Sequence, residues 1–276
     1  MFSRNAFVRI AMAMIMLLPL YGAISFIINF SKQIYCNIPT QKQPIPTIPR
    51  IAWPQHGLLT LWFDDAYNSQ GSPALIQLMQ KYGFVAAISV PTSFICKPGR
   101  LTWQQLQYLQ NIGWEITSHS VSHYCNPNNY TSAAIIDREV AQSKITLESR
   151  SLRADNFVIP GGFSNGVLPN VVNRVKQFYS SYRIDKEQSN PLPLPNAYEI
   201  TSYSINNTTD EKDIAHWINY AKEKNRWIIL TIDQIDNKLL KHHISLDKLE
   251  RIMNLITQEK IPVVLPDQVI QIAKIE

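Results

Sequence analysis

The sequence predicts an α/β fold with a parallel sheet or barrel, preceded by one N-terminal transmembrane helix. From Gly57 onward, short apolar segments alternate with segments whose apolar residues recur at the helical period, and this alternation is typical of β-α-β units. Before that point, an uncharged and mostly apolar run extends from Ile10 to Ile28. With 276 residues, of which 45% are hydrophobic and 17% charged, the chain can build one sizeable packed domain and is short for two.

Apolar content and period set the expected elements. Strands are expected at residues 58–62, 84–90, 116–117, 157–159, 227–232 and 262–265. Helices are expected at residues 73–82, 102–112, 131–152, 212–224 and 245–260. Thr102 and Gln105 have the spacing of a capping box, and Gly83 and Gly113 are placed to end the first two helices. The pattern between residues 163 and 211 is less regular.

The N-terminal run has the features of a membrane anchor. Its length is close to the roughly 20 residues that a helix needs to cross a bilayer. Arg4 and Arg9 precede it, which favours a cytoplasmic N-terminus and places the rest of the chain outside the cytoplasm. A cleaved signal peptide is the alternative, but the run is long for such a peptide and no convincing A-x-A cleavage site follows. We therefore expect an anchor at residues 1–32, a Pro-rich linker at 33–52 and one folded domain at 53–276, which carries the candidate site described below.

Charge and cysteine content argue against other partners and sites. The net charge of +5 is spread along the chain without a dense Lys/Arg block, so nucleic acid is not an expected partner. The three cysteines include no CxxC pair, which argues against a zinc site made of cysteines. Cys96 and Cys125 either pair in an oxidising compartment or remain free thiols, and the sequence leaves both open.

Two pairs of residues point to a metal-dependent site. Asp64 and Asp65 directly follow an expected strand, and parallel barrels carry catalytic groups at the carboxyl ends of their strands. Adjacent carboxylates repel one another unless a cation binds one and leaves the other for proton transfer. His119 and His123 are four residues apart, which on a helical turn places both imidazoles on one face. Either pair alone is more often a solvated turn or two surface histidines, whereas together they can hold one cation with positions open for water and substrate.

A third segment, Pro160-Gly161-Gly162, follows the strand expected at 157–159. Glycines at such a turn let backbone N–H groups approach a ligand and stabilise an oxyanion. An ordinary Pro-Gly turn explains the same residues equally well, so this pattern does not decide the matter by itself.

These motifs resemble, in order and spacing, those of the polysaccharide deacetylase family, which shares the NodB homology domain and forms carbohydrate esterase family four. The resemblance extends over about residues 57–270. The first motif resembles residues 59–67, the second 117–123, the third 157–162 and the fifth 227–236. Ser69-Gln70 and Tyr82-Gly83-Phe84 also resemble a membrane-associated subgroup of the family.

The resemblance implies a distorted (β/α) barrel that hydrolyses N-acetyl groups on a GlcNAc-containing polysaccharide. By their places in the motifs, Asp65, His119 and His123 are expected to bind a divalent metal, usually zinc, and Asp64 to act as general base. Gly161 is expected to offer its backbone N–H to the oxyanion. This chemistry is self-consistent, because a metal lowers the pKa of a bound water toward about 7 and a carboxylate base can then take its proton.

The chain departs from the family pattern at two positions. It has Asp233 where the fifth motif normally presents a histidine as general acid, and Val158 where the third motif often carries an arginine that holds the base. An aspartate with an ordinary pKa near 3.9 is ionised at neutral pH and is a poor acid. Three interpretations stay open: burial raises the pKa of Asp233, His242 or His243 takes its place, or the domain binds metal and glycan with little catalysis.

The leading hypothesis is therefore a membrane-anchored, metal-dependent polysaccharide deacetylase that acts outside the cytoplasm on an N-acetylated glycan of the cell envelope. A glycan-binding domain with weakened or no activity is the alternative that Asp233 motivates. A third hypothesis is another amide hydrolase on the same barrel, such as a cyclic amidase.

Overall fold

The computed structural model describes Cys36 and residues 57–162 and 167–273. The chain divides into two units, Met1–Pro39 and Thr40–Glu276, and the fold below is that of the second. Apart from Cys36, the anchor and linker expected at 1–32 and 33–52 lie outside the described residues. Among the helices that are described, none is long and apolar enough to span a bilayer.

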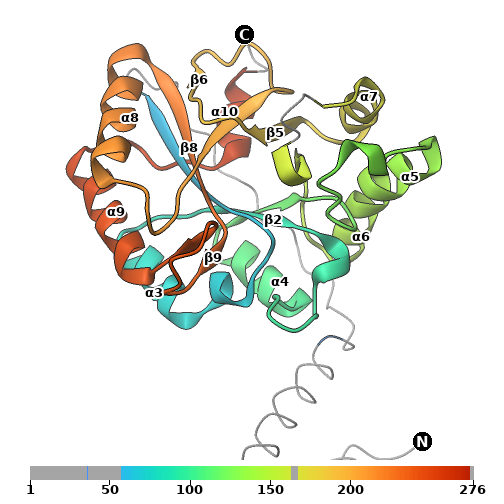
Figure 1. Ribbon diagram of the computed structural model, residues 1–276, viewed down its shortest axis with the longest axis horizontal. Helices are drawn as coiled ribbons and strands as arrows, with labels where there is room; N and C mark the ends of the chain where they lie inside the picture. Colours follow the sequence, from blue (N-terminus) through green and yellow to red (C-terminus); the bar gives the residue numbers. More distant parts are fainter. Residues whose placement is uncertain (1–35, 37–56, 163–166, 274–276) are drawn as a thin grey trace, which may run out of the picture. The chain divides into compact units, whose positions relative to one another are not determined.

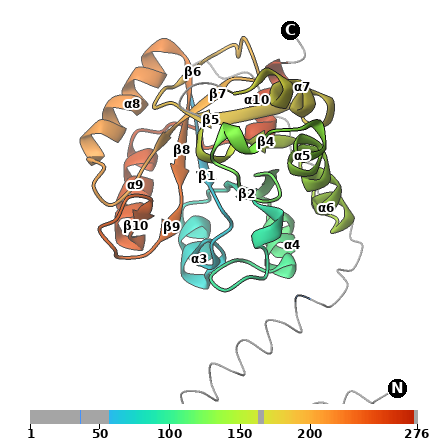
Figure 2. The same ribbon diagram turned by 45° about the vertical axis from the view of Figure 1, so that its right-hand side comes forward.

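Seven parallel strands in the described part of the chain close into a barrel (Figures 1 and 2). They are β1 (Leu58–Phe63), β2 (Ala87–Val90), β3 (Glu115–Ser118), β4 (Asn156–Val158), β5 (Ser181–Asp185), β7 (Ile200–Ser204) and β8 (Arg226–Ile232). Each strand pairs with the next, and β8 returns to β1 over its whole length, from the pair Leu58 and Trp227 to the pair Phe63 and Ile232. The short β6 (Asn190–Pro191) adds to β8 in the antiparallel sense. The prediction of an α/β fold with a parallel barrel is confirmed.

Helices surround the barrel (Figure 1). They are α3 (Pro73–Lys81), α4 (Trp103–Asn111), α5 (Ala133–Asp137), α6 (Ser143–Ser149), α7 (Pro169–Phe178), α8 (Glu211–Lys224), α9 (Leu246–Gln258) and α10 (Pro266–Ala273). The capping box expected at the start of α4 is formed, because the Thr102 hydroxyl accepts from the Gln105 N–H and the Gln105 side chain accepts from the Thr102 N–H.

Strand alternation places successive residues of β1 on opposite faces. Leu59, Leu61 and Phe63 pack in a core with residues of the surrounding helices, including Leu75 of α3, Leu106 of α4 and Ile252 of α9. Leu58 and Trp62 belong to a separate apolar cluster that also holds Trp227 of β8 and Val269 and Ile270 of α10. The next position on that second face is Asp64, so the period of the strand directs this carboxylate toward the barrel interior.

Three expectations differ from the structure. Residues 262–265 form no strand, and only Val263 bridges to Leu59; prolines at 262 and 266 remove backbone donors there. The helix expected at 131–152 is α5 and α6 joined by a π-helical turn at Arg138–Gln142. The less regular middle contains α7, β5, β6 and β7, whose strands of two to five residues are too short to show a clear period.

Candidate active site

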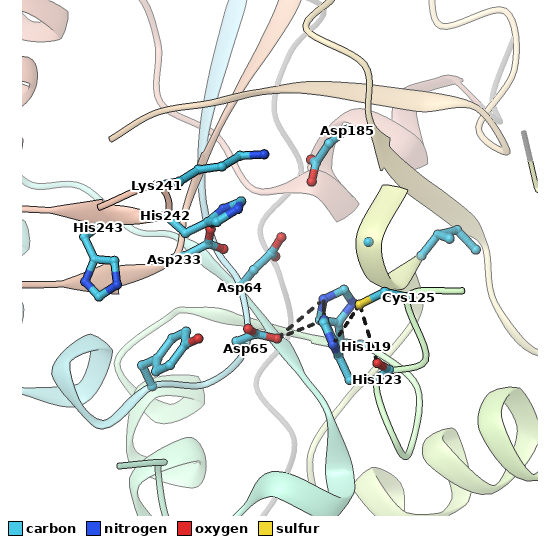
Figure 3. A pocket seen from close by; sticks show the side chains of 13 residues that line it. Asp64, Asp65, His119, His123, Cys125, Asp185, Asp233, Lys241, His242 and His243 are labelled. Atoms are coloured by element: carbon cyan, nitrogen blue, oxygen red, sulfur yellow. Dashed lines mark hydrogen bonds and ion pairs between the residues drawn. The ribbon is translucent and has the colours of Figure 1, made fainter. Parts of the chain in front are cut away.

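A pocket of about 360 Å³ lies where β1, β3, β4, β5 and β8 end (Figure 3). It is lined by all six residues that the sequence singled out, namely Asp64, Asp65, His119, His123, Gly161 and Asp233. Segments far apart in the chain thus meet at one end of the barrel, as the location of strand ends predicts. The roles assigned to these residues remain predictions.

The turn after β1 separates the two aspartates. Asp65 has a φ of 73° and Ala66 a φ of 52°, a left-handed conformation that is unfavourable for residues with a Cβ. Neighbouring groups hold it, because Arg100 Nη1 donates to the Asp65 carbonyl at 2.5 Å and the Leu101 N–H donates to the Ala66 carbonyl at 2.9 Å. Asp64 consequently points to the barrel interior and Asp65 to the histidines.

The side chains of Asp65, His119 and His123 converge on one point. Asp65 Oδ1 lies 3.1 Å from His123 Nε2 and 3.8 Å from His119 Nε2, and the two Nε2 atoms are 3.1 Å apart. Within the described residues, Asp65 Oδ1 is buried and accepts no hydrogen bond. One potential ligand atom from each of the three residues lies within 4.8 Å of the others. A buried carboxylate oxygen without a donor, facing two imidazole nitrogens, fits a divalent cation.

The surroundings of both histidines suit the same role. His119 Nδ1 lies 2.9 Å from the Val158 carbonyl, to which only an N–H can donate, so in the neutral ring Nε2 is the nitrogen with the lone pair that a metal needs. Burial, together with the neighbouring His119, lowers the pKa of His123 to about 4. His123 is therefore neutral at physiological pH, as a metal ligand must be.

The two histidines do not share a helical turn, so that part of the interpretation was wrong. Residues 119–123 form a loop after β3, with φ values of 65° at Ser120 and 56° at His123. The Ser120 hydroxyl accepts from the His123 N–H at 3.0 Å, and buried Glu139 accepts from the N–H groups of Val121 and Ser122. Spacing of four residues brings the rings together here through a folded loop, not through helix geometry.

Asp64 is fixed by an arginine that the sequence reasoning missed. Arg183 Nη2, from β5, donates to Asp64 Oδ2, and Arg183 is fully buried. Arg183 pairs in register with Val158 of β4, the position where the family pattern often has its arginine. The Asp64 carboxylate is therefore held by an arginine from β5, the strand next to β4, although position 158 itself is a valine.

One feature of the sequence could have indicated that Arg183 and Asp185 lie on a strand. Both are charged and alternate with Tyr182 and Ile184, which is the period of a half-polar strand. In the structure Arg183 Nη1 donates to Ser202 Oγ at 3.1 Å and lies 3.4 Å from Asp185 Oδ1, and Asp185 lines the pocket. The alternating segment has only five residues, which is too few to identify it as a strand from sequence.

One buried side chain connects the two acidic loops. Gln70 Nε2 donates to the carbonyl of Asp64 at 2.5 Å and to that of Asp233 at 2.7 Å. Asp64 follows β1 and Asp233 follows β8, so this amide ties the ends of two neighbouring strands together. Gln70 thereby sets the spacing between the predicted base and the other side of the pocket.

Asp233 does not stand alone. Its Oδ2 lies 2.6 Å from Nδ1 of His242, which follows the short β9 (Gln234–Ile235) and precedes β10 (His243–Ile244). Burial raises the pKa of Asp233, and the hydrogen bond with Asp233 raises the pKa of His242. His243 is paired instead with Asp236, 2.8 Å from Nδ1 to Oδ1.

Gly161 and Cys125 are in close contact on the wall of the pocket. Gly161 has a φ of 67°, and a Cβ built there would lie 2.6 Å from the Cβ of Cys125, so only glycine fits. Cys125 is a free thiol, with its Sγ 3.4 Å from His123 Nδ1, whereas Cys96 is disulfide-bonded. Cys96 and Cys125 therefore do not pair with each other.

Residues 54–177 match the family model for polysaccharide deacetylase. The fold is similar to a family 4 acetyl xylan esterase from Clostridium thermocellum solved with a cobalt ion (16% identity, TM-score 0.54, covering 78% of this chain and 91% of that one). It is also similar to the peptidoglycan deacetylase PdaC from Bacillus subtilis (16% identity, TM-score 0.51, covering 79% and 92%). A third similar structure is a CE4 family pseudoenzyme from Bacillus anthracis (12% identity, TM-score 0.52, covering 82% and 70%). No curated protein matches the chain. The barrel expected from the motifs is thus the fold of CE4 structures.

Proposed function

We propose that this chain, whose residues 54–177 match the polysaccharide deacetylase family, is a metal-dependent hydrolase that removes N-acetyl groups from a GlcNAc-containing polysaccharide. One observation carries the proposal. Three potential ligand atoms, from Asp65, His119 and His123, lie within 4.8 Å of one another beside a second carboxylate, Asp64, that is buried against Arg183. This arrangement combines a cation site with a separate proton acceptor, as metal-assisted hydrolysis requires.

Asp65, His119 and His123 would hold the cation, for which zinc is the expected ion given two imidazoles and one carboxylate. When bound, a divalent cation would supply Lewis-acid activation of water and of the acetyl carbonyl. Asp64 accepts a proton from the attacking water, and Arg183 keeps its carboxylate aimed at the pocket. The Gly161 N–H, which also belongs to the pocket lining, donates to the developing oxyanion.

The test is acetate release from N-acetylglucosamine oligomers by the metal-loaded protein. We expect Asp64→Asn to abolish release while the folded protein keeps its metal, because Asp64 is not a proposed ligand. Asp213→Asn, which changes an exposed carboxylate on α8, is the matched control and should behave as wild type. Equal acetate release by wild type and Asp64→Asn would reject the assigned base.

A glycan-binding domain without hydrolytic activity is the second candidate. Asp233, in place of the expected acid histidine, favours it. One protein of similar fold is described as a pseudoenzyme, which bears on that protein alone. Oligosaccharide binding measured by calorimetry, with no acetate released in the presence of zinc, cobalt or manganese, would select this candidate over the hydrolase.

We also propose that the chain is anchored by a single membrane-spanning segment at residues 1–32, with its domain outside the cytoplasm. The apolar run from Ile10 to Ile28 and the preceding arginines support this orientation. The disulfide at Cys96 supports an oxidising compartment. The test uses membranes from expressing cells, with protease added on the side away from the cytoplasm. We expect this protease to digest the domain. A full-length domain released into the soluble extracytoplasmic fraction would indicate cleavage instead.

A further inference from the structure

The Asp233–His242 pair supplies what the proposed reaction still lacks, a proton for the departing amine. The two residues are separated by a loop that leaves β8 and returns, and both line the pocket (Figure 3). Because the Asp233 carboxylate accepts from Nδ1–H of His242, the other ring nitrogen, Nε2, is the one available to the pocket. In the protonated imidazole that nitrogen carries a transferable proton.

The backbone holds His242 in this place at some conformational cost. His242 has a φ of 68°, which an L-residue adopts only when its surroundings enforce it. The Gln234 N–H donates to the His242 carbonyl at 3.0 Å, and His243 pairs in register with Gln234 between β10 and β9. Gln70 fixes the backbone of Asp233 on the other side. Both partners of the pair are therefore positioned before any substrate arrives.

The surroundings favour the protonated form of the pair. The hydrogen bond with Asp233 raises the pKa of His242, nearby Asp185 acts in the same direction, and Lys241 opposes it. Burial and then the charge of Asp64 raise the pKa of Asp233. Asp233 is only 15% exposed, whereas the His242 side chain is 52% exposed. The imidazole is thus the member of the pair that a substrate can reach.

Resting on the proposed deacetylase function, we propose that His242 is the general acid of the reaction and that Asp233 is its positioning residue. The attacking water gives one proton to Asp64 while the oxygen of the water forms a bond to the acetyl carbon. The C–N bond then breaks, its electron pair goes to nitrogen, and that nitrogen takes the proton from Nε2 of His242. Asp64 afterwards releases its proton and His242 takes one up, so an amide and water have become an amine and acetic acid.

Leaving-group dependence tests this assignment. An acetamide on GlcNAc needs a proton on its leaving nitrogen, whereas 4-nitrophenyl acetate loses a stable phenolate without one. We expect His242→Gln to lower kcat/KM for acetyl-GlcNAc oligomers by about 10²–10⁴-fold and for the aryl ester by less than about 3-fold. Asp64→Asn should lose both activities, and His216→Gln, an exposed histidine on α8, should lose neither.

The outcomes separate the two levels of the proposal. A wild-type protein that releases no acetate from any acetylated glycan overturns the function and the acid together. An active wild type in which His242→Gln spares the amide, or in which His243→Gln gives the selective loss instead, overturns only the assignment of His242. For Asp233, the imidazole pKa of His242 followed by NMR should fall in Asp233→Asn; an unchanged pKa contradicts the positioning role, whatever the activity.

Discussion

Arg183 in the middle of β5 donates to the carboxylate of Asp64, 119 positions earlier in the chain and at the end of β1. The guanidinium is fully buried, lies 4.9 Å from the Trp62 ring and also bonds Ser202 and Thr231. A buried charge pair with so many hydrogen-bond partners fixes the orientation of both side chains. It makes Asp64 a fixed acceptor instead of a mobile carboxylate.

Replacement of this arginine tests how much the buried ion pair contributes to stability. We expect Arg183→Met to lower the free energy of unfolding by roughly 3–5 kcal/mol, because it leaves the Asp64 charge buried without a partner. Denaturant unfolding measures this. In the double variant Arg183→Met/Asp64→Asn much of the loss should return, since no unpaired charge remains. A double variant no more stable than Arg183→Met would show that the ion pair is not the cause.

Metal retention tests the proposed role of the three converging side chains. We expect Asp65→Ala, which removes the unpartnered buried oxygen between the imidazoles, to lose bound zinc after dialysis against a mild chelator. Elemental analysis of the dialysed protein gives the metal content. Asp64→Asn should keep its metal under the same conditions. Equal zinc in Asp65→Ala and wild type would place the cation elsewhere.

Gln70 offers a test of the spacing between the two acidic loops. In Gln70→Met the carbonyls of Asp64 and Asp233 lose a buried donor, so we expect a loss of about 1–3 kcal/mol in unfolding free energy. We also expect a lower kcat, since both loops carry proposed catalytic groups. Gln80→Met, an exposed change on α3, is the control. A Gln70→Met protein with wild-type stability and kcat would argue against the tie.

Gly161 is constrained by both backbone and space. Gly161→Ala should destabilise the protein, because φ is 67° and the new Cβ would meet the Cβ of Cys125 at 2.6 Å. Gly83→Ala is a matched control with a similar φ of 66° and no atom within 4 Å, so it isolates the backbone contribution of about 1 kcal/mol. Thermal unfolding of both variants should show the larger loss for Gly161→Ala. If Cys125→Gly, combined with Gly161→Ala, does not reduce the extra loss of stability, the contact with Cys125 does not explain that loss.

The buried carboxyl of Glu115, which does not line the pocket, should make the stability of the protein depend on pH. This carboxyl, on β3, accepts from Asn156 Nδ2 at 2.6 Å and from the Asp267 N–H at 2.9 Å, and burial raises its pKa to about 8. The pKa of Glu115 is higher in the folded protein than in the unfolded chain, so the folded state binds the proton more tightly. The resulting stability is complete below about pH 4.5 and declines as the pH rises toward about 8.

The matched variant for this effect is Glu115→Gln, which cannot ionise. We expect its unfolding free energy to change less than that of wild type between pH 5 and pH 8, with the difference on the order of a few kcal/mol. Urea unfolding at several pH values measures the slope. Parallel slopes for the two proteins would mean that Glu115 does not titrate in this range.

Local sequence was enough for the elements and motifs with strong signals. The apolar run of β8, the capping box at Thr102 and the glycine after α3 follow from the chemistry of a few neighbouring residues, and each was predicted. The gathering of Asp65, His119 and His123 followed from their positions after strands, because parallel strands end on one side of a barrel.

Only the tertiary structure decided which partners those residues have. Arg183 meets Asp64 because β5 and β1 face each other across the closed barrel, and His242 meets Asp233 because a loop after β8 turns back. Neither contact can be predicted from the hydrophobic period or from the spacing of neighbouring residues. Both depend on the closure of the barrel and on left-handed turns at single residues. The sequence by itself therefore determined which side chains are candidates for the chemistry, and the packing of distant strands determined which partners hold each of them in place.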